Sequence, residues 1–223
     1  DVMSSLQKQL GISDYPTLSK DKKAQAISEL MLQVREDYQR PLTLQMLKQW
    51  HQTLMKFDKT VKEGEWRSST EPMQIISGRA GKIEVHFEAP PKAILDQELT
   101  AFINWFNASR QDIALDPLLR AAITHLWFLT LHPLEDGNGR IARLLTDLAL
   151  AQAEARSIRF YAMSVAILQR RRSYYDILEQ TQRGDLDITP WLLWFFDTLK
   201  SAIEQVLQDI EQNVAKTRFW QNA

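Results

Sequence analysis

The sequence predicts a mainly α-helical protein, a helical bundle that carries one small β-hairpin. Glycine is scarce, with seven residues in 223, or about 3% where about 7% is usual. Neither glycine nor proline occurs between Gly139 and Gly184, and a stretch of that length without breakers is typical of helices. The exception is Met73–Phe87, which has β-branched residues on both sides of a glycine-containing turn.

Amphipathic spacing, caps and breakers define the expected helices. Thr43 can cap one helix, while Asp116–Pro117 and Thr189–Pro190 each combine a capping oxygen with a proline at the first helical position. The predicted helices are Lys20–Asp37, Leu44–Lys56, Asp96–Asn107, Pro117–Leu131, Arg140–Glu154, Val165–Gln182 and a last helix from Thr189 past Leu207.

The expected hairpin lies within Met73–Phe87. Ile75 and Ile76 precede the turn, and Gly78 and Gly81 supply turn conformations. A lone hairpin on a helical body is marginally stable. It is therefore expected either to pack down as a brace or to stay partly exposed and add a strand to a partner.

Composition excludes several classes of protein and site. The chain has 27 Lys+Arg against 28 Asp+Glu, a net charge of −1, which argues against a surface built for nucleic acid or an anionic membrane. It has no cysteine, so disulfides, cysteine nucleophiles and cysteine-bound zinc are excluded. The longest wholly apolar run, Trp191–Phe196, is far shorter than the roughly 20 residues of a membrane span. We expect a cytoplasmic protein that contacts no membrane.

The segment HPLEDGNGRIAR, residues 132–143, gathers groups suited to phosphate chemistry. Pro133 pushes His132 out of the preceding helix, to the rim of a loop, where an imidazole is a suitable general base. Gly137, Asn138 and Gly139 then turn the backbone so that its N–H groups form a concave anion site at a helix N-terminus.

The charged residues of this segment complete the predicted site. Arg140 and Arg143 are three residues apart on one helical face, and both can reach an anion held there. Asp136 could hold Mg²⁺ together with phosphate oxygens. Each residue alone is more often structural, as a helix cap, a turn or a solvated charge. Their combination within twelve residues predicts a site that grips a polyphosphate and abstracts one proton beside it.

Residues 132–143 resemble the signature of Fic domains, H-x-F-x-[DE]-G-N-G-R-x-x-R. The resemblance extends over about two-thirds of the chain, from about Glu63 onward, and includes the runs Ser173–Leu178 and Gly184–Trp191. It implies a Fic-type helical bundle. The expected domains are a helical N-terminal extension over residues 1–60, a catalytic core over 61–200 with the hairpin as a flap, and a C-terminal helix over 201–223 that continues the last core helix.

The resemblance implies transfer of AMP from ATP to a Ser, Thr or Tyr hydroxyl of a target protein, with release of pyrophosphate. By this resemblance His132 is the catalytic base, Asp136 holds Mg²⁺, and Gly137, Asn138 and Gly139 cradle the phosphates. Arg140 and Arg143 reach the β- and γ-phosphates. Tyr174 and Tyr175 match a tyrosine pair near the adenine, although core packing explains such a pair equally well. Ile75, Ile76 and Gly78 are the expected flap contacts to the target backbone.

The chain departs from the family pattern at two points. The usual Phe of the motif is Leu134, which we expect to be a smaller core anchor with the chemistry intact. No inhibitory string [ST]-x-x-x-E-[GN] occurs. Residues Asp1–Ile12 resemble the segment that follows such a helix, which leaves room for the inhibitor upstream of Asp1, as for a winged-helix module after Ala223.

Other functions stay open for the same residues. The same fold could transfer phosphate or another nucleotide, or remove AMP. Arg140 speaks against the branch that transfers phosphate, where lysine is typical at that position. The chain could also be an ATP-binding regulatory module without transfer, and a homodimer is compatible with the sequence.

Overall fold

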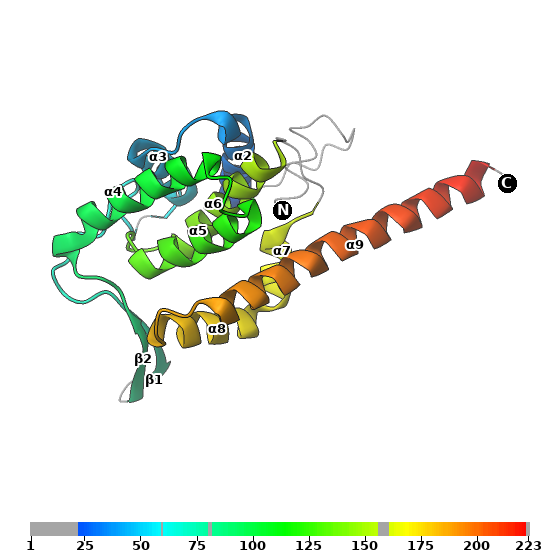
Figure 1. The fold of residues 1–223 in the computed structure, drawn as a ribbon. Coiled ribbons are helices and arrows are strands. Elements are labelled where there is room, and N and C mark those ends of the chain that lie inside the picture. Colours follow the sequence, from blue (N-terminus) through cyan, green and yellow to red (C-terminus); the bar gives the residue numbers. More distant parts are fainter. Residues whose placement is uncertain (1–21, 59, 80–81, 156–160, 222–223) are drawn as a thin grey trace. The chain divides into compact units, whose positions relative to one another are not determined.

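The computed structural model describes residues 22–58, 60–79, 82–155 and 161–221, and forms two compact units with their boundary between Ser157 and Ile158 (Figure 1). The predicted boundaries near residues 60 and 200 stay predictions. The segment Asp1–Ile12 lies outside the described residues.

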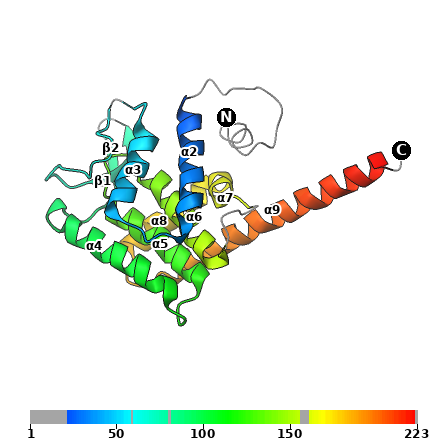
Figure 2. The ribbon, with the colours of Figure 1, turned by 90° about the horizontal axis from the view of Figure 1, so that it is seen from above.

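The first unit is a helical bundle built around α5 and α6. These two helices share the most extensive contact, and α2, α3 and α4 pack beside them (Figure 2). The side chains of Trp50, Phe102, Phe106 and Phe128 are completely buried in its core. The elements of the bundle are α2 (Lys22–Glu36), η1 (Asp37–Gln39), α3 (Leu44–Met55), α4 (Lys92–Ala108), η2 (Ser109–Gln111), α5 (Pro117–Leu131) and α6 (Asn138–Glu154).

The helix predictions hold for this unit, with shifts at five of the described termini. Helix α2 ends at Glu36 rather than Asp37, and α4 ends at Ala108 rather than Asn107. Helix α5 has the predicted bounds, and the Asp116 carboxylate caps it by accepting hydrogen bonds from the N–H groups of Leu118 and Leu119. Helix α4 begins at Lys92, four residues before the predicted start, because Pro91 serves as its N-cap in an extended conformation. Helix α6 begins at Asn138 rather than Arg140, and α3 ends at Met55 rather than Lys56.

The predicted hairpin is confirmed as strands β1 (Gln74–Arg79) and β2 (Lys82–Glu88), which pair antiparallel. A register shift between Ile75 and Ile76 marks a β-bulge. The N–H of Ala89 donates to the Met73 carbonyl at 2.9 Å and closes the base of the hairpin. Among the described residues the sheet has only these two strands, so each strand keeps one unpaired edge.

The second unit contains α7 (Met163–Gln169), α8 (Arg171–Arg183) and α9 (Thr189–Gln221). The single helix predicted over Val165–Gln182 is therefore wrong, because the chain breaks at Arg170. The Arg170 guanidinium pairs with Asp197 and donates to the Ser201 hydroxyl at 2.6 Å, both on α9. These contacts join α9 to the break between α7 and α8, and sequence periodicity does not reveal them. No helix of the described ranges is long and apolar enough to cross a membrane.

Candidate active site

His132 ends α5 in a left-handed backbone conformation, with φ 44° and ψ 55°. Pro133 disfavours a continued helix at this position, as the sequence predicts. The His132 N–H still donates to the Phe128 carbonyl at 3.1 Å. A left-handed conformation is costly for any residue other than glycine, and it persists where the surroundings hold it.

The His132 imidazole is half-buried, and its Nδ1 lies 3.3 Å from the Leu129 carbonyl oxygen. Since a carbonyl only accepts, this contact places the proton of the neutral ring on Nδ1 and leaves the Nε2 lone pair available. Burial lowers the pKa of His132 below 6.5, and the positive charge of Arg67 lowers it further, against opposing effects of the Leu129 carbonyl and Asp136. The ring is therefore neutral at neutral pH, as a general base requires.

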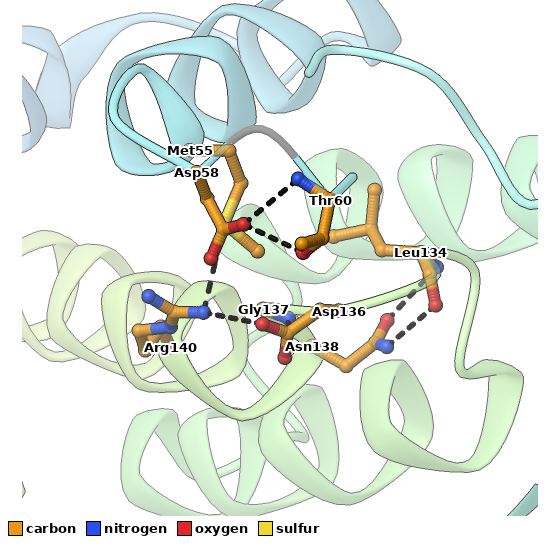
Figure 3. A network of polar contacts seen from close by, with 8 residues as sticks. All are labelled: Met55, Asp58, Thr60, Leu134, Asp136, Gly137, Asn138 and Arg140. Carbon is orange, nitrogen blue, oxygen red and sulfur yellow. Dashed lines mark hydrogen bonds and ion pairs between the residues drawn. The ribbon is translucent and has the colours of Figure 1, made fainter. Parts of the chain in front are cut away.

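The loop between α5 and α6 is closed by the Asn138 side chain (Figure 3). Its Oδ1 accepts from the Leu134 N–H at 2.9 Å, and its Nδ2 donates to the Leu134 carbonyl at 2.8 Å. Leu134 is 1% exposed, which confirms it as a core anchor. Because the Asn138 carboxamide is committed to the loop, its backbone N–H is the group of this residue left for a ligand.

The two glycines of the motif have different roles. Gly137 is left-handed at φ 86°, and an added Cβ would lie 3.1 Å from Met55 Cε and 3.3 Å from Leu54 Cδ2, both on α3. Gly139 is helical, and a Cβ there would meet no atom of the described residues within 4 Å. Asn138 and Gly139 occupy the first two positions of α6, where N–H groups have no helical acceptor. Gly137 thus makes the turn, while the space at Gly139 leaves these donors open.

Asp136 and Arg140 form an ion pair at the rim of this loop (Figure 3). The Arg140 guanidinium lies 2.9 Å from the Asp136 carboxylate and 3.6 Å from Met55 Sδ, and the Asp58 carboxylate points toward it. The other Asp136 oxygen accepts from the Gly137 N–H at 2.6 Å. The Asp136 side chain is 57% exposed. An accessible carboxylate beside the N-terminus of α6 fits Mg²⁺, which takes one or two carboxylates together with phosphate oxygens.

Arg143 lies one helical turn beyond Arg140 on α6 and is half-buried. It forms no hydrogen bond or ion pair with a residue that the structure describes. Its guanidinium is therefore available to an anion at the N-terminus of α6, and helical spacing places it on the face of Arg140.

The flap residues predicted from the sequence lie on β1. Ile75 is 36% exposed and Ile76 54% exposed, and Gly78 pairs with Ile83 across the hairpin. Exposed apolar side chains on a strand with a free edge are compatible with strand addition. The predicted tyrosine pair lies in the second unit, on α8. There Tyr174 is buried, with its ring centroid 5.5 Å from that of Trp194, whereas Tyr175 is 54% exposed.

Two residues of this region escaped the sequence analysis. Arg67 is 3% exposed and donates to the backbone carbonyls of His132 and Pro90. His51 is completely buried, its Nδ1 accepts from the Gly64 N–H at 2.9 Å, and a Cβ added at Gly137 would lie 3.5 Å from its Cδ2. No sequence signal distinguishes either residue, because both act on backbone groups that every residue carries.

The comparisons with known proteins match this geometry. The family model described as Fic/DOC matches residues 41–150. The protein adenylyltransferase Fic of Nematostella vectensis is 31% identical over 116 residues, which are 52% of this chain and 26% of that protein. The protein of the same name from Culex quinquefasciatus is 29% identical over 166 residues, 74% of this chain and 29% of that protein. The chain thus spans less than a third of the length of these relatives.

Solved structures show the same fold. A Fic-domain-containing signaling protein from Bacteroides thetaiotaomicron superimposes with a TM-score of 0.64 at 24% identity, over 92% of this chain and 80% of that chain. Fic-1 from C. elegans has a TM-score of 0.64 at 18% identity, over 96% of this chain and 59% of that one. These likenesses establish the architecture of the helical bundle with its hairpin.

Proposed function

Since this chain is a Fic-domain protein, we propose that it transfers AMP from ATP to a hydroxyl group of a target protein and releases pyrophosphate. The observation that carries the proposal is the juxtaposition of a neutral imidazole with an open helix N-terminus. His132 ends α5, and six residues later the free N–H groups of α6 begin. Relatives named protein adenylyltransferase support the same reaction.

In the proposed reaction His132 Nε2 takes the proton of the target hydroxyl. The hydroxyl oxygen forms a bond to the α-phosphorus of ATP as the bond from that phosphorus to the β-phosphate bridging oxygen breaks, so pyrophosphate leaves. The Asn138 and Gly139 N–H groups and the α6 dipole stabilise the phosphate charge. Mg²⁺ on Asp136 would neutralise charge on the phosphates when it is bound.

The arginines and the remaining predicted residues complete the proposal. Arg140 exchanges its pairing with Asp136 for the β-phosphate, while Arg143 takes the γ-phosphate. Tyr174 and Tyr175 are proposed beside the adenine, and Ile75, Ile76 and Gly78 are proposed to hold the target backbone. We also propose a cytoplasmic location, and a homodimer stays compatible with the proposal.

Transfer of label from ATP tests the function. The protein is incubated with ATP labelled at the α-phosphate, Mg²⁺ and cell lysate, beside His132→Ala and the control Arg110→Ala. Arg110 is exposed and lies in η2, away from the motif. We expect labelled protein bands with the parent chain and Arg110→Ala and a loss of about 10²–10⁴-fold with His132→Ala. Equal labelling by all three would refute the assigned base.

The mass of the adduct separates the alternatives. Added AMP supports the proposal, whereas added phosphate assigns the fold to phosphate transfer. If ATP binds and no group is transferred, the chain acts as a nucleotide-binding regulatory module instead.

A further inference from the structure

We propose that Arg67 is a positioning residue that fixes the backbone of His132 and ties it to the base of the β1–β2 hairpin. This inference rests on the proposed function, since it concerns the base of that reaction. Arg67 lies between α3 and β1, 65 residues before His132 in the chain.

One buried residue joins three backbone segments here. The Arg67 Nε donates to the His132 carbonyl at 3.0 Å, and the Arg67 backbone N–H donates to the Pro133 carbonyl at 2.8 Å. A terminal nitrogen of the guanidinium donates to the Pro90 carbonyl. Pro90 follows Ala89, whose N–H closes the base of the hairpin. The hairpin and the loop that carries His132 therefore share one anchor.

The guanidinium is suited to this role because of its fixed fork. Its donors point in defined directions, so two carbonyls held at once set the distance and angle between their segments. No carboxylate of the described residues pairs with Arg67. Burial lowers the pKa of Arg67 from its usual value, but the pKa of an arginine is high enough for the side chain to remain a cation at neutral pH.

The hydrogen bonds of Arg67 to the His132 and Pro133 carbonyls, here called the clamp, act where the left-handed backbone of His132 needs support. The only other left-handed residue besides glycine in the described ranges is Ala155, whose N–H bonds only to carbonyls of its own helix α6. His132 has the corresponding bond to Phe128, and in addition its carbonyl is held by Arg67. The carbonyl direction follows the ψ angle of His132, so the clamp keeps the peptide, and with it the imidazole, in one orientation.

The same arginine acts on the imidazole through its charge. Three groups besides burial affect the pKa of His132: Arg67 lowers it, while the Leu129 carbonyl and Asp136 raise it. Removal of the Arg67 charge should therefore raise this pKa. A merely structural arginine at a distance would not change it.

Arg120 provides the matched control. It is also 3% exposed and donates to the Phe106 carbonyl at 2.7 Å, the Ser109 hydroxyl at 3.0 Å and the Gln152 side-chain oxygen at 2.8 Å. It lies in the first turn of α5, at the opposite end from His132. Arg120→Met and Arg67→Met remove the same charge and the same kind of buried hydrogen bonds.

The experiment compares Arg67→Met, Arg67→Lys and Arg120→Met with the parent chain. It measures thermal unfolding, kcat and KM for ATP below the lowest melting temperature, and the pKa of His132 by NMR. We expect both Met variants to lower the melting temperature. Arg67→Met should lower kcat by about 10–100-fold with KM for ATP changed less, and raise the pKa of His132, whereas Arg120→Met should leave kcat and this pKa unchanged.

Arg67→Lys separates geometry from charge. Lysine keeps the charge but lacks the fork, so kcat should fall while the pKa of His132 stays close to that of the parent chain. If Arg67→Met is not folded, this variant decides the outcome, and parent-like kcat in Arg67→Lys overturns the positioning role. A parent-like pKa and kcat in folded Arg67→Met overturn it as well. Failure of the parent chain to transfer AMP overturns the proposed function instead, and the pKa of His132 then still tests the clamp.

Discussion

A buried arginine fastens backbone segments at each end of α5, but the two ends differ in the polar groups that remain without a hydrogen bond among the described residues. At the amino end the Asp116 carboxylate caps the helix, and Arg120 donates to Phe106, Ser109 and Gln152 while its guanidinium lies 4.2 Å from the Phe106 ring centroid. At the carboxyl end Arg67 holds the carbonyl of His132. In both places a buried arginine without a carboxylate partner among the described residues fastens backbone segments together.

What differs is the set of polar groups left over. At the carboxyl end, His132 Nε2, the N–H groups of Asn138 and Gly139, and the Arg143 guanidinium form no hydrogen bond within the described residues. At the amino end the donors of Arg120 and the capping carboxylate are engaged. The contrast teaches that unused donors and acceptors, more than a gathering of charged residues, distinguish the end of this helix where we propose the active site.

The largest expected effect concerns His125, the histidine within α5. His125 is completely buried, its Nδ1 lies 2.8 Å from the Thr146 hydroxyl, and burial lowers its pKa to about 3. The unfolded chain binds this proton below pH 6.5 and the folded chain does not, so stability falls as pH drops from 6.5 toward 3, by at most about 5 kcal/mol. Denaturant unfolding at a series of pH values measures the slope.

His125→Asn is the control for that slope. It keeps a polar atom for Thr146 and removes the titrating group, so its stability should depend less on pH over this window. An equal slope in both proteins would assign the effect to other groups, among them His51 and His132, whose pKa values are also lowered.

Replacement of Arg143 should weaken ATP binding, whereas replacement of Arg120 should lower stability. Arg143→Ala removes a charged donor that is free for phosphate, so ATP binding should weaken by about 1.5–3 kcal/mol with little change in stability. Arg120→Met should cost stability and leave ATP binding unchanged. Calorimetric titration with ATP and thermal unfolding measure the two quantities, and unchanged ATP affinity in Arg143→Ala would contradict the γ-phosphate assignment.

Gly137 and Gly139 should respond in opposite directions. Gly137→Ala places a side chain in the left-handed region against Met55, so the protein should lose about 1–2 kcal/mol of stability. Gly139→Ala has room within a helix and should gain about 0.5–1 kcal/mol, while its methyl group obstructs phosphate and raises KM for ATP. A Gly139→Ala variant with parent-like KM would show that phosphate does not approach this position.

The smallest effect on activity is expected at the amino end of α5. Asp116→Ala removes the side-chain acceptor of the Leu118 and Leu119 N–H groups and should cost about 1 kcal/mol of stability. Because this end contributes no group to the site, kcat and KM should not change below the melting temperature. A loss of kcat at full folding would mean that the two ends are not independent.

The sequence predicts both ends of α5 correctly, because these ends depend on local chemistry. Asp116–Pro117 defines the start of α5, and Pro133 defines its end at Leu131. Sequence periodicity does not predict the break at Arg170, because the Arg170 side chain contacts Asp197 and Ser201, which lie far along the chain. The sequence suggests that Gly139 is a turn residue, but its backbone is helical, and of the two glycines in the motif only Gly137 is left-handed.

The positioning role proposed for Arg67 could not be predicted from the sequence for a related reason. Its acceptors are the backbone carbonyls of His132 and Pro90, and every residue type carries such a carbonyl. The sequence thus indicates the residues proposed to react, while the residue proposed to position His132 becomes visible only in three dimensions.

NMR titration of the His132 imidazole in the parent chain tests most directly whether a neutral base stands at the open end of α5. We predict a pKa below 6.5 and, in the neutral ring, a proton on Nδ1 with Nε2 free to accept. A pKa at or above 6.5, or a neutral ring protonated on Nε2, would contradict the assignment of His132 as the base.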